Sequence, residues 1–436
     1  MLISLVLFVI TYILMLLCPK YRHFVALGSA GGFVLLGLFG VISYTPIEAL
    51  AEVDWNVLLM LLGTMGLVSL FIASKAPAFL AERLIARMPN VRFAAAALAL
   101  LAGIISAFVD NVATVLMVAP VGLAIAKKLK ISPVPIVIAI AVSSNLQGAA
   151  TLVGDTTSIL LGAYTGMNFF DFFFMEGRPG IFWAVELGAL ASTFVLLFLF
   201  RKETAPVHTI GNTRVEDALP SAMLLLMIVL LVGASFLPEP EQPVLHALYE
   251  MRSGLICVLL CVICTLCTCR KQKTWAPVRN IFAELDTQTL LLLTGLFVVI
   301  GGIRSAGVIR AIGSLFSRVA GDSPFRLYTL LVFASVLLSA FVDNIPYVAT
   351  MLPVVAETAG SMSGVSPYVF YFGLLSGATL GGNLTPIGAS ANIAAIGILR
   401  KNGCEVSTRD FLRIGVPFTI AAVLTGYVFI WITWGH

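Results

Sequence analysis

Apolar residues fill most of the chain in long runs that short polar stretches separate. Eight runs approach the ~20 residues that a helix needs to cross a bilayer, and they lie at about 2–18, 24–42, 56–74, 181–200, 221–237, 253–269, 288–303 and 414–434. Four longer segments, at 93–129, 133–165, 327–360 and 367–399, are interrupted midway by Gly, Pro or Asp. The pattern predicts an all-α polytopic membrane protein in which some helices break inside the membrane.

The composition supports this interpretation. Of the 436 residues, 59% are hydrophobic and 11% are charged, whereas soluble domains carry about 25% charged residues. No basic region precedes the first apolar run, which predicts a retained helix rather than a cleaved signal peptide. We interpret the net charge of +4 through its distribution along the loops. It is a signal of orientation and not of nucleic-acid binding.

The basic residues separate onto two sides when 93–129 and 327–360 are read as re-entrant hairpins and the other ten segments as single crossings. On that reading 20 of the 26 Lys and Arg residues fall on one side and 6 on the other. The positive-inside rule assigns the larger group to the cytoplasm. We therefore expect a multi-pass protein of the cell (inner) membrane with both termini extracytoplasmic.

The sequence Ser-Ala-Phe-Val-Asp-Asn occurs twice, at 106–111 and at 339–344. Around it, 54–63 aligns with 286–295 at an offset of 232, and 150–154 aligns with 384–388 at an offset of 234. Each half holds five crossings, an odd number, so the second half is predicted to be inverted relative to the first, as in many secondary transporters. The predicted organisation is a first repeat at 1–202 with a hairpin at 93–129 and a broken helix at 133–165, a cytoplasmic linker at 203–219, and a second repeat at 220–436 with a hairpin at 327–360 and a broken helix at 367–399.

The two hexapeptides place Asp110 and Asp343 in apolar surroundings, where a carboxylate is costly and marks a functional site. Two opposed hairpins would bring these tips to similar depth, and irregular backbone is tolerated there only where it lines a cavity. Asp110 and Asp343, with Asn111 and Asn344, are therefore candidate Na⁺ ligands. The breaks supply the other candidate ion-binding and substrate-binding residues, which are Thr114, Thr151, Gly154, Asp155, Thr156, Ser158, Asn383, Thr385, Gly388, Ser390 and Asn392.

These residue types suit the binding of ions. Amino ends of half-helices offer amide hydrogens to an anion, while carbonyl and carboxylate oxygens suit Na⁺ or a proton. We expect H⁺ or Na⁺ as the coupling ion, no cofactor and no catalytic residue. Two structural interpretations stay open beside this one: the aspartates cap the hairpin turns, and the glycines serve helix packing.

Three motifs, at 106–116, 339–353 and 381–392, resemble the ion transporter superfamily. The resemblance is to the group of the arsenite-pump permease, the NhaD-type sodium/proton antiporter and the melanosomal P protein, which share a citrate-transporter-like domain, and it is closest to the P-protein branch. It implies an elevator-type mechanism in a homodimer whose hairpins and broken helices move together. In related dicarboxylate transporters the tips carry Ser-Asn-Thr; here Asp110-Asn111-Val112 and Asp343-Asn344-Ile345 occupy those places.

The aspartates bear on the cargo, because two carboxylates repel a di- or tricarboxylate and attract cations or protons. We therefore expect a secondary active transporter, and not an enzyme, that moves a small inorganic ion, by Na⁺/H⁺ exchange or by export of an oxyanion such as arsenite. The alternative is coupled uptake of citrate or a dicarboxylate. More remote are an ion channel and an intramembrane aspartyl protease, which also needs two carboxylates. The expected partners are membrane lipid, the small ion and a second copy of the chain.

Overall fold

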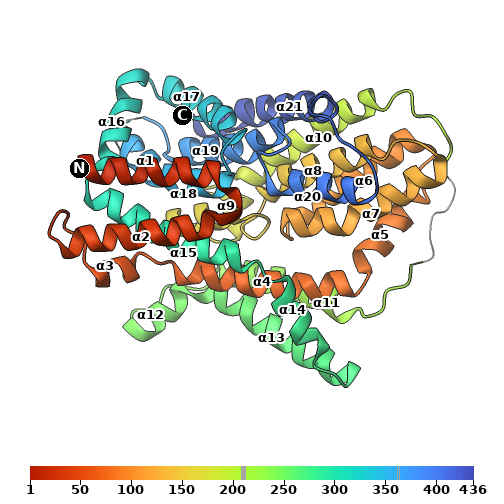
Figure 1. Cartoon of the computed structure of the whole chain (residues 1–436), viewed down its shortest axis with the longest axis horizontal. Coiled ribbons are helices and arrows are strands. Elements are labelled where there is room, and N and C mark those ends of the chain that lie inside the picture. The colour runs from red at the N-terminus through yellow and green to blue at the C-terminus, as the bar shows by residue number, and fades with distance from the viewer. Residues whose placement is uncertain (208–212, 361, 363) are drawn as a thin grey trace.

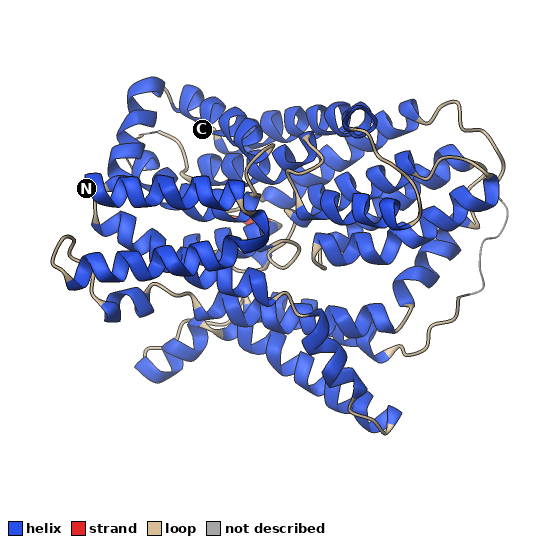
Figure 2. Ribbon diagram, in the orientation of Figure 1, coloured by secondary structure: helices blue, strands red, loops and turns tan. Residues whose placement is uncertain are grey.

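The computed structural model describes all residues except 208–212, 361 and 363, and the described chain is almost entirely helical (Figure 2). The first half holds α1 (Leu2–Leu17), η1 (Pro19–Tyr21), α2 (Arg22–Leu38), α3 (Pro46–Ala51), α4 (Trp55–Ala73), α5 (Ala76–Ile85), α6 (Val91–Ser106), α7 (Asn111–Leu129), α8 (Val134–Gly148), α9 (Thr156–Thr165), η2 (Phe170–Phe172) and α10 (Ile181–Leu199). A two-residue hairpin, β1 (Phe174–Met175) with β2 (Arg178–Pro179), lies between η2 and α10.

The second half repeats this order. It holds α11 (Leu219–Ala234), α12 (Pro243–Glu250), α13 (Arg252–Gln272), α14 (Ala276–Glu284), α15 (Thr287–Ser305), α16 (Val308–Ala320), α17 (Pro324–Ser339), α18 (Asn344–Ala359), α19 (Tyr368–Gly381), η3 (Gly382–Leu384), α20 (Ser390–Lys401) and α21 (Thr408–Trp434). The prediction of an all-α polytopic membrane protein is confirmed. The inversion of one half relative to the other stays a prediction.

By length and composition, six helical segments of the described chain are able to cross a membrane, among them α7, α10, α13, α15 and α21. A seventh is possible if α1 and α2 count as one span, but the chain bends by 115° between them. The predicted total of ten single crossings and two hairpins stays a prediction. Although α7 is 19 residues long, it begins at the hexapeptide, which is where the hairpin was predicted to turn.

The helices pack as two groups that both halves build together. In the scaffold group, α1–α4 and α11–α15, helix α2 packs on α15 and α4 packs on α13. In the hairpin group, α6–α10 and α17–α21, helix α6 packs on α8, α17 on α19 and α10 on α21. Helices α5 and α16 connect the two groups. Figure 1 shows α4, α11, α13 and α14 along the lower edge, with α8, α10, α20 and α21 above them.

Glycines at equivalent places let the scaffold helices approach closely. A Cβ atom at Gly63 of α4 would lie 2.3 Å from the backbone carbon of Cys257 in α13, and one at Gly295 of α15 would lie 2.7 Å from that of Ala26 in α2. Both distances are too short for any side chain. Since Cys257 is fully buried at this contact, it serves as a small packing residue.

Candidate ion-binding site

Both hairpin tips are built in the same way, with an aspartate that caps the second helix. Asp110 precedes α7, and its Oδ2 accepts hydrogen bonds of 3.0 Å from the amides of both Val112 and Ala113. Asp343 precedes α18, and its Oδ1 accepts from the amide of Ile345 at 3.1 Å. A carboxylate offers about four acceptor positions. Capping therefore leaves each aspartate able to bind a further partner, and the two interpretations made from the sequence are compatible.

The threonines of the two breaks attach each break to the neighbouring tip. Thr151 donates from Oγ1 to the carbonyl oxygen of Ala107, and Thr385 donates to that of Ala340. Ala107 and Ala340 are the second residues of the two hexapeptides. The same hydrogen bond therefore occurs once in each half, and both predicted ligands act as supports of the tips.

Two further predicted residues, Gly154 and Gly388, allow the breaks to touch the tips. A Cβ atom at Gly154 would lie 2.7 Å from the carbonyl oxygen of Ala107, and one at Gly388 would lie 2.9 Å from that of Ala340. A side chain does not fit at either position. The interpretation of these glycines as packing residues describes their surroundings best.

Ser158 and Asn392 each donate hydrogen bonds across one of the two breaks. Ser158 donates from Oγ to the carbonyl oxygen of Gly148 at 3.3 Å. Asn392 donates from Nδ2 to the carbonyl oxygens of Gly382 at 3.0 Å and of Thr385 at 3.2 Å. Polar side chains here replace hydrogen bonds that the helix loses at its break.

A cavity of about 460 Å³ lies where the two tips, the breaks and the scaffold group meet. Of the residues predicted from the sequence, it brings together Asp110, Asn111, Asp155, Thr156, Asn344 and Ser390. The scaffold contributes Arg22, Met65, Val68, Ser69, Ile72, Glu284, Asp286 and Thr289. The cavity thus has one wall from each group of helices, and each wall contains residues of both halves.

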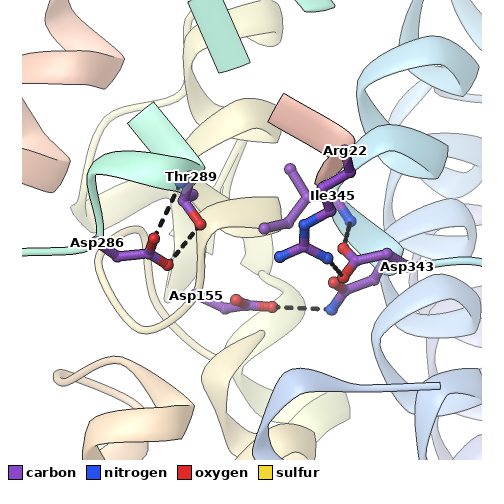
Figure 3. Close-up of polar contacts among 7 residues, drawn as sticks. Arg22, Asp155, Asp286, Thr289, Asp343 and Ile345 are labelled. Carbon is purple, nitrogen blue, oxygen red and sulfur yellow. Dashed lines mark hydrogen bonds and ion pairs between the residues drawn. The ribbon is translucent and has the colours of Figure 1, made fainter. Parts of the chain in front are cut away.

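Asp155 lies between the breaks and the second tip. Its Oδ2 accepts from Thr157 Oγ1 at 2.8 Å, its Oδ1 accepts from the amide of Thr156 at 2.8 Å, and Asn344 approaches Oδ2 from Nδ2 at 3.4 Å. In Figure 3 a dashed line runs from Asp155 towards the second tip, where Asp343 is labelled. The aspartate has no counterpart in the second half, where Ala389 takes its place. It therefore adds one carboxyl group to the cavity that the repeat does not explain.

Asn383 lies behind the cavity in a network that joins the halves. Asn111 donates to Asn145 Oδ1 at 3.0 Å, Asn145 donates to Asn383 Oδ1 at 3.2 Å, and Asn383 donates to the carbonyl oxygen of Val142 at 2.8 Å. Thr114 is fully buried one turn further along α7. Asn145 was not predicted from the sequence, although the repeat aligns it with another polar residue, Thr379.

The sequence reasoning also missed Arg22, which it treated only as a marker of orientation. Its guanidinium forms an ion pair with Asp343 Oδ2, and both side chains are 21% exposed. Figure 3 shows Arg22 reaching the second tip from the scaffold, opposite the Asp286–Thr289 contact at the start of α15. The sequence held one sign of its role: Arg22 and Arg252 are the first residues of equivalent helices in the two halves.

The cavity is acidic. Asp110, Asp155, Glu284 and Asp286 line it, and Arg22 is the one basic residue among its described lining residues. That guanidinium is already paired with Asp343. An excess of carboxylates in a cavity attracts cations and protons and repels anions.

A sequence profile described as "Citrate transporter" matches residues 12–265 and 244–435. The chain belongs to the citrate transporter family. An uncharacterized transporter of Mycobacterium tuberculosis is 30% identical over 443 residues, which cover 99% of this chain and 98% of that one. The human P protein is 23% identical, with 92% of this chain and 56% of the P protein covered. These similarities confirm the resemblance read from the motifs.

Two solved transporter structures share the fold of this citrate transporter family member. The YdaH transporter of Alcanivorax borkumensis has a TM-score of 0.60 at 15% identity, with 88% of this chain and 87% of that chain covered. MtrF of Neisseria gonorrhoeae has a TM-score of 0.58 at 14% identity, with 91% and 84% covered. At this identity the likeness concerns the fold. With the family, it identifies a multi-span membrane transporter.

Proposed function

We propose that the protein is a secondary active transporter that exchanges a small cation, with Na⁺ as the first candidate, for protons. The observation that carries this proposal is the acidic cavity between the two hairpin tips. Carboxylates near one another hold protons or cations, and they release one when they bind the other. Such competition for one set of oxygens couples two opposite fluxes when the carrier changes sides only with a proton or a cation bound.

The position of the cavity supports an elevator-type mechanism. One wall belongs to the hairpin group and the other to the scaffold group, so a displacement of one group past the other would carry the tips and a bound ion with them. The asparagine network fastens the two halves of the hairpin group together. An inverted repeat and a homodimer accord with this mechanism and stay part of the proposal.

Coupled transport of citrate or a dicarboxylate is the second candidate. It is favoured by the description of the family, by a cavity volume within the range of small-molecule sites, and by the guanidinium of Arg22. Against it stands the excess of carboxylates, which a polyanion would have to overcome. The charge balance therefore ranks the cation first.

The test is flux into proteoliposomes that contain the purified protein, with pH and Na⁺ gradients imposed separately. Na⁺, K⁺, arsenite and citrate are offered in turn. We expect proton movement driven by a Na⁺ gradient and saturable in Na⁺. Citrate uptake without proton–cation exchange would favour the second candidate, arsenite flux would favour the oxyanion form of the prediction, and currents at channel rates would overturn both.

The role of the tips is tested in the same assay with Asp343→Asn, which should abolish coupled exchange. The matched control is Asp322→Asn, the same change in an exposed loop, which should leave it intact. Unchanged gradient-driven flux in Asp343→Asn would remove Asp343 from the site.

A further inference from the structure

Two equivalent helices of the scaffold group begin with an arginine, and one of these arginines forms an ion pair with a hairpin tip. Arg22 is the first residue of α2 and pairs with Asp343. Arg252 is the first residue of α13. Because α2 packs on α15 and α13 packs on α4, and α4 aligns with α15, the two arginines occupy corresponding positions.

Arg252 has local partners instead of a carboxylate. It donates to the carbonyl oxygen of Tyr249 at 2.8 Å and lies 3.8 Å from the centre of the Tyr249 ring. The ion pairs formed by the described residues do not include it. Its guanidinium is thus held by an uncharged neighbour three residues away, and a carboxylate would be a stronger partner.

Arg252 lines a second cavity of about 730 Å³ that corresponds to the first one on the scaffold side. It contains Glu52 and Asp54, which align at an offset of 232 with Glu284 and Asp286 of the first cavity. The hairpin group lines this second cavity with the C-terminal part of α9 and with Gly166, which follows it, and with no described residue of a hairpin tip. The scaffold group therefore forms two similar acidic walls, each with an arginine, and the hairpin tips lie against the first of them.

Asp110 is the tip residue that corresponds to Asp343, and it is therefore the candidate partner of Arg252. Both hydrogen bonds from the α7 amides go to Oδ2, so Oδ1 is available for another donor. At the other tip, Asp343 accepts the Ile345 amide on Oδ1 and the guanidinium of Arg22 on Oδ2. One carboxylate has its counter-ion in this conformation, and its equivalent does not.

We propose that Arg22 and Arg252 are alternating counter-ions of the hairpin tips: Arg22 pairs with Asp343 in the conformation described here, and Arg252 pairs with Asp110 in the opposite end state. This inference rests on the proposed elevator motion. In each end state one tip is neutralised by the scaffold and the other keeps its charge for the transported cation. The arginines are positioning residues that set the balance between the two states.

The test follows the distance between α1 of the scaffold and α18 of the hairpin group. The hydroxyl of Tyr12 donates to the carbonyl oxygen of Pro346 at 2.6 Å and contacts Thr350, so Tyr12→Cys with Thr350→Cys reports the present conformation. The seven native cysteines are replaced first. The measured quantity is the rate of cross-linking by a short bifunctional thiol reagent in proteoliposomes.

Arg22→Gln should lower the ratio of the present conformation to the opposite one by about tenfold, and Arg252→Gln should raise that ratio by about tenfold, because a charge-assisted hydrogen bond that biases two states changes their ratio by that order. The cross-linking rate should therefore fall in the first variant and rise in the second. Asp343→Asn should act like Arg22→Gln, and combining the two should add little. Asp110→Asn should act like Arg252→Gln. Arg22→Lys should restore most of the rate and so separates loss of charge from misfolding.

The control is Lys271→Gln, which breaks a 2.8 Å pair with Asp217 outside both cavities and should not change the rate. If Arg252→Gln lowers the rate or leaves it unchanged, Arg252 is not the alternate partner and the inference is wrong. Flux by the wild-type protein is measured independently. Its absence would overturn the proposed function, whereas opposite shifts without flux would still support the alternating pairs.

Discussion

The two hairpin tips share a hexapeptide and a capping geometry, yet they differ in their surroundings. Asp343 is paired with Arg22 from the scaffold, while Asp110 is held by two amides of its own helix. Local sequence determines the cap, because the aspartate and the amides that it accepts lie within three residues. The counter-ion depends on where one group of helices sits against the other. Equal sequences therefore end in unequal electrostatic states.

After the loss of coupled exchange expected for Asp343→Asn, the largest effect concerns the tip without a counter-ion. Asp110→Asn removes the carboxylate but keeps a good capping residue, so the unfolding temperature should change little. Exchange of Na⁺ for protons should fall roughly 100-fold, the order expected for the loss of a charged ligand. The measurement is the initial rate of flux in proteoliposomes, and a rate within a factor of about three of wild type would show that Asp110 is only a cap.

The glycines that touch the tips should be equally sensitive in both halves. Gly154→Ala and Gly388→Ala each push a methyl group against a carbonyl oxygen, and we expect each to cost about 3 kcal/mol of stability. Thermal unfolding in detergent measures the effect. Gly233→Ala, where a Cβ atom has open space, is the control and should have no such effect. A large difference between Gly154→Ala and Gly388→Ala would break the equivalence of the breaks.

The ion pair should make the second tip respond differently to neutralisation. Asp343→Asn leaves the Arg22 guanidinium partly buried without its partner, so it should lower stability by about 2 kcal/mol. Arg22→Gln in the same chain should recover most of that loss. Asp110→Asn gains nothing from Arg22→Gln. Unfolding temperatures of the single and double variants measure the coupling, and additive losses for Arg22→Gln with Asp343→Asn would contradict the pair.

The hydrogen bonds across the two breaks should differ less in their contribution to stability. Asn392 makes two hydrogen bonds across its break, and Ser158 makes one at 3.3 Å. Asn392→Ala should therefore cost about 1 kcal/mol more than Ser158→Ala. Thermal unfolding of both variants gives the difference. Equal losses would mean that the second bond of Asn392 contributes nothing.

The smallest effect should come from an ion pair between the linker and the scaffold group. Lys271 contacts Asp217 of the linker at 2.8 Å. Burial raises the pKa of Asp217, but the hydrogen bonds from Lys271 and the Leu219 amide outweigh this and hold the pKa below its ordinary value. A lowered folded-state pKa stabilises the protein above about pH 4, the unfolded value, and the stabilisation is lost as the pH falls through the folded value.

Asp217→Asn should therefore lower stability by less than about 1 kcal/mol at pH 7, and the difference from wild type should shrink towards pH 3. Transport should be unchanged, in contrast to variants of the Arg22–Asp343 pair. Unfolding temperatures across this pH range, with flux at pH 7, provide the measurement. A loss of flux as large as that of Asp343→Asn would show that the pair between the linker and the scaffold also controls the cycle.

Much of the fold could be predicted from the sequence because membrane helices are defined by long apolar runs and their breaks by Gly, Pro and Asp. Three candidates from the sequence, Asp110, Asn111 and Asp155, line one cavity, and their binding of an ion stays a prediction. Thr151 and Gly388 were proposed as ligands but support the tips, since sequence alone does not distinguish a side chain that faces a ligand from one that faces a carbonyl. Arg22 was missed because its partner lies 321 residues away.

The most direct test of the acidic exchange site is the release of protons when an ion is added to the detergent-purified protein in weak buffer. The account predicts that Na⁺ releases protons saturably, that Asp110→Asn strongly reduces this release, and that citrate causes none. Proton uptake on addition of citrate, with no response to Na⁺, would contradict it and would make the cavity a carboxylate site.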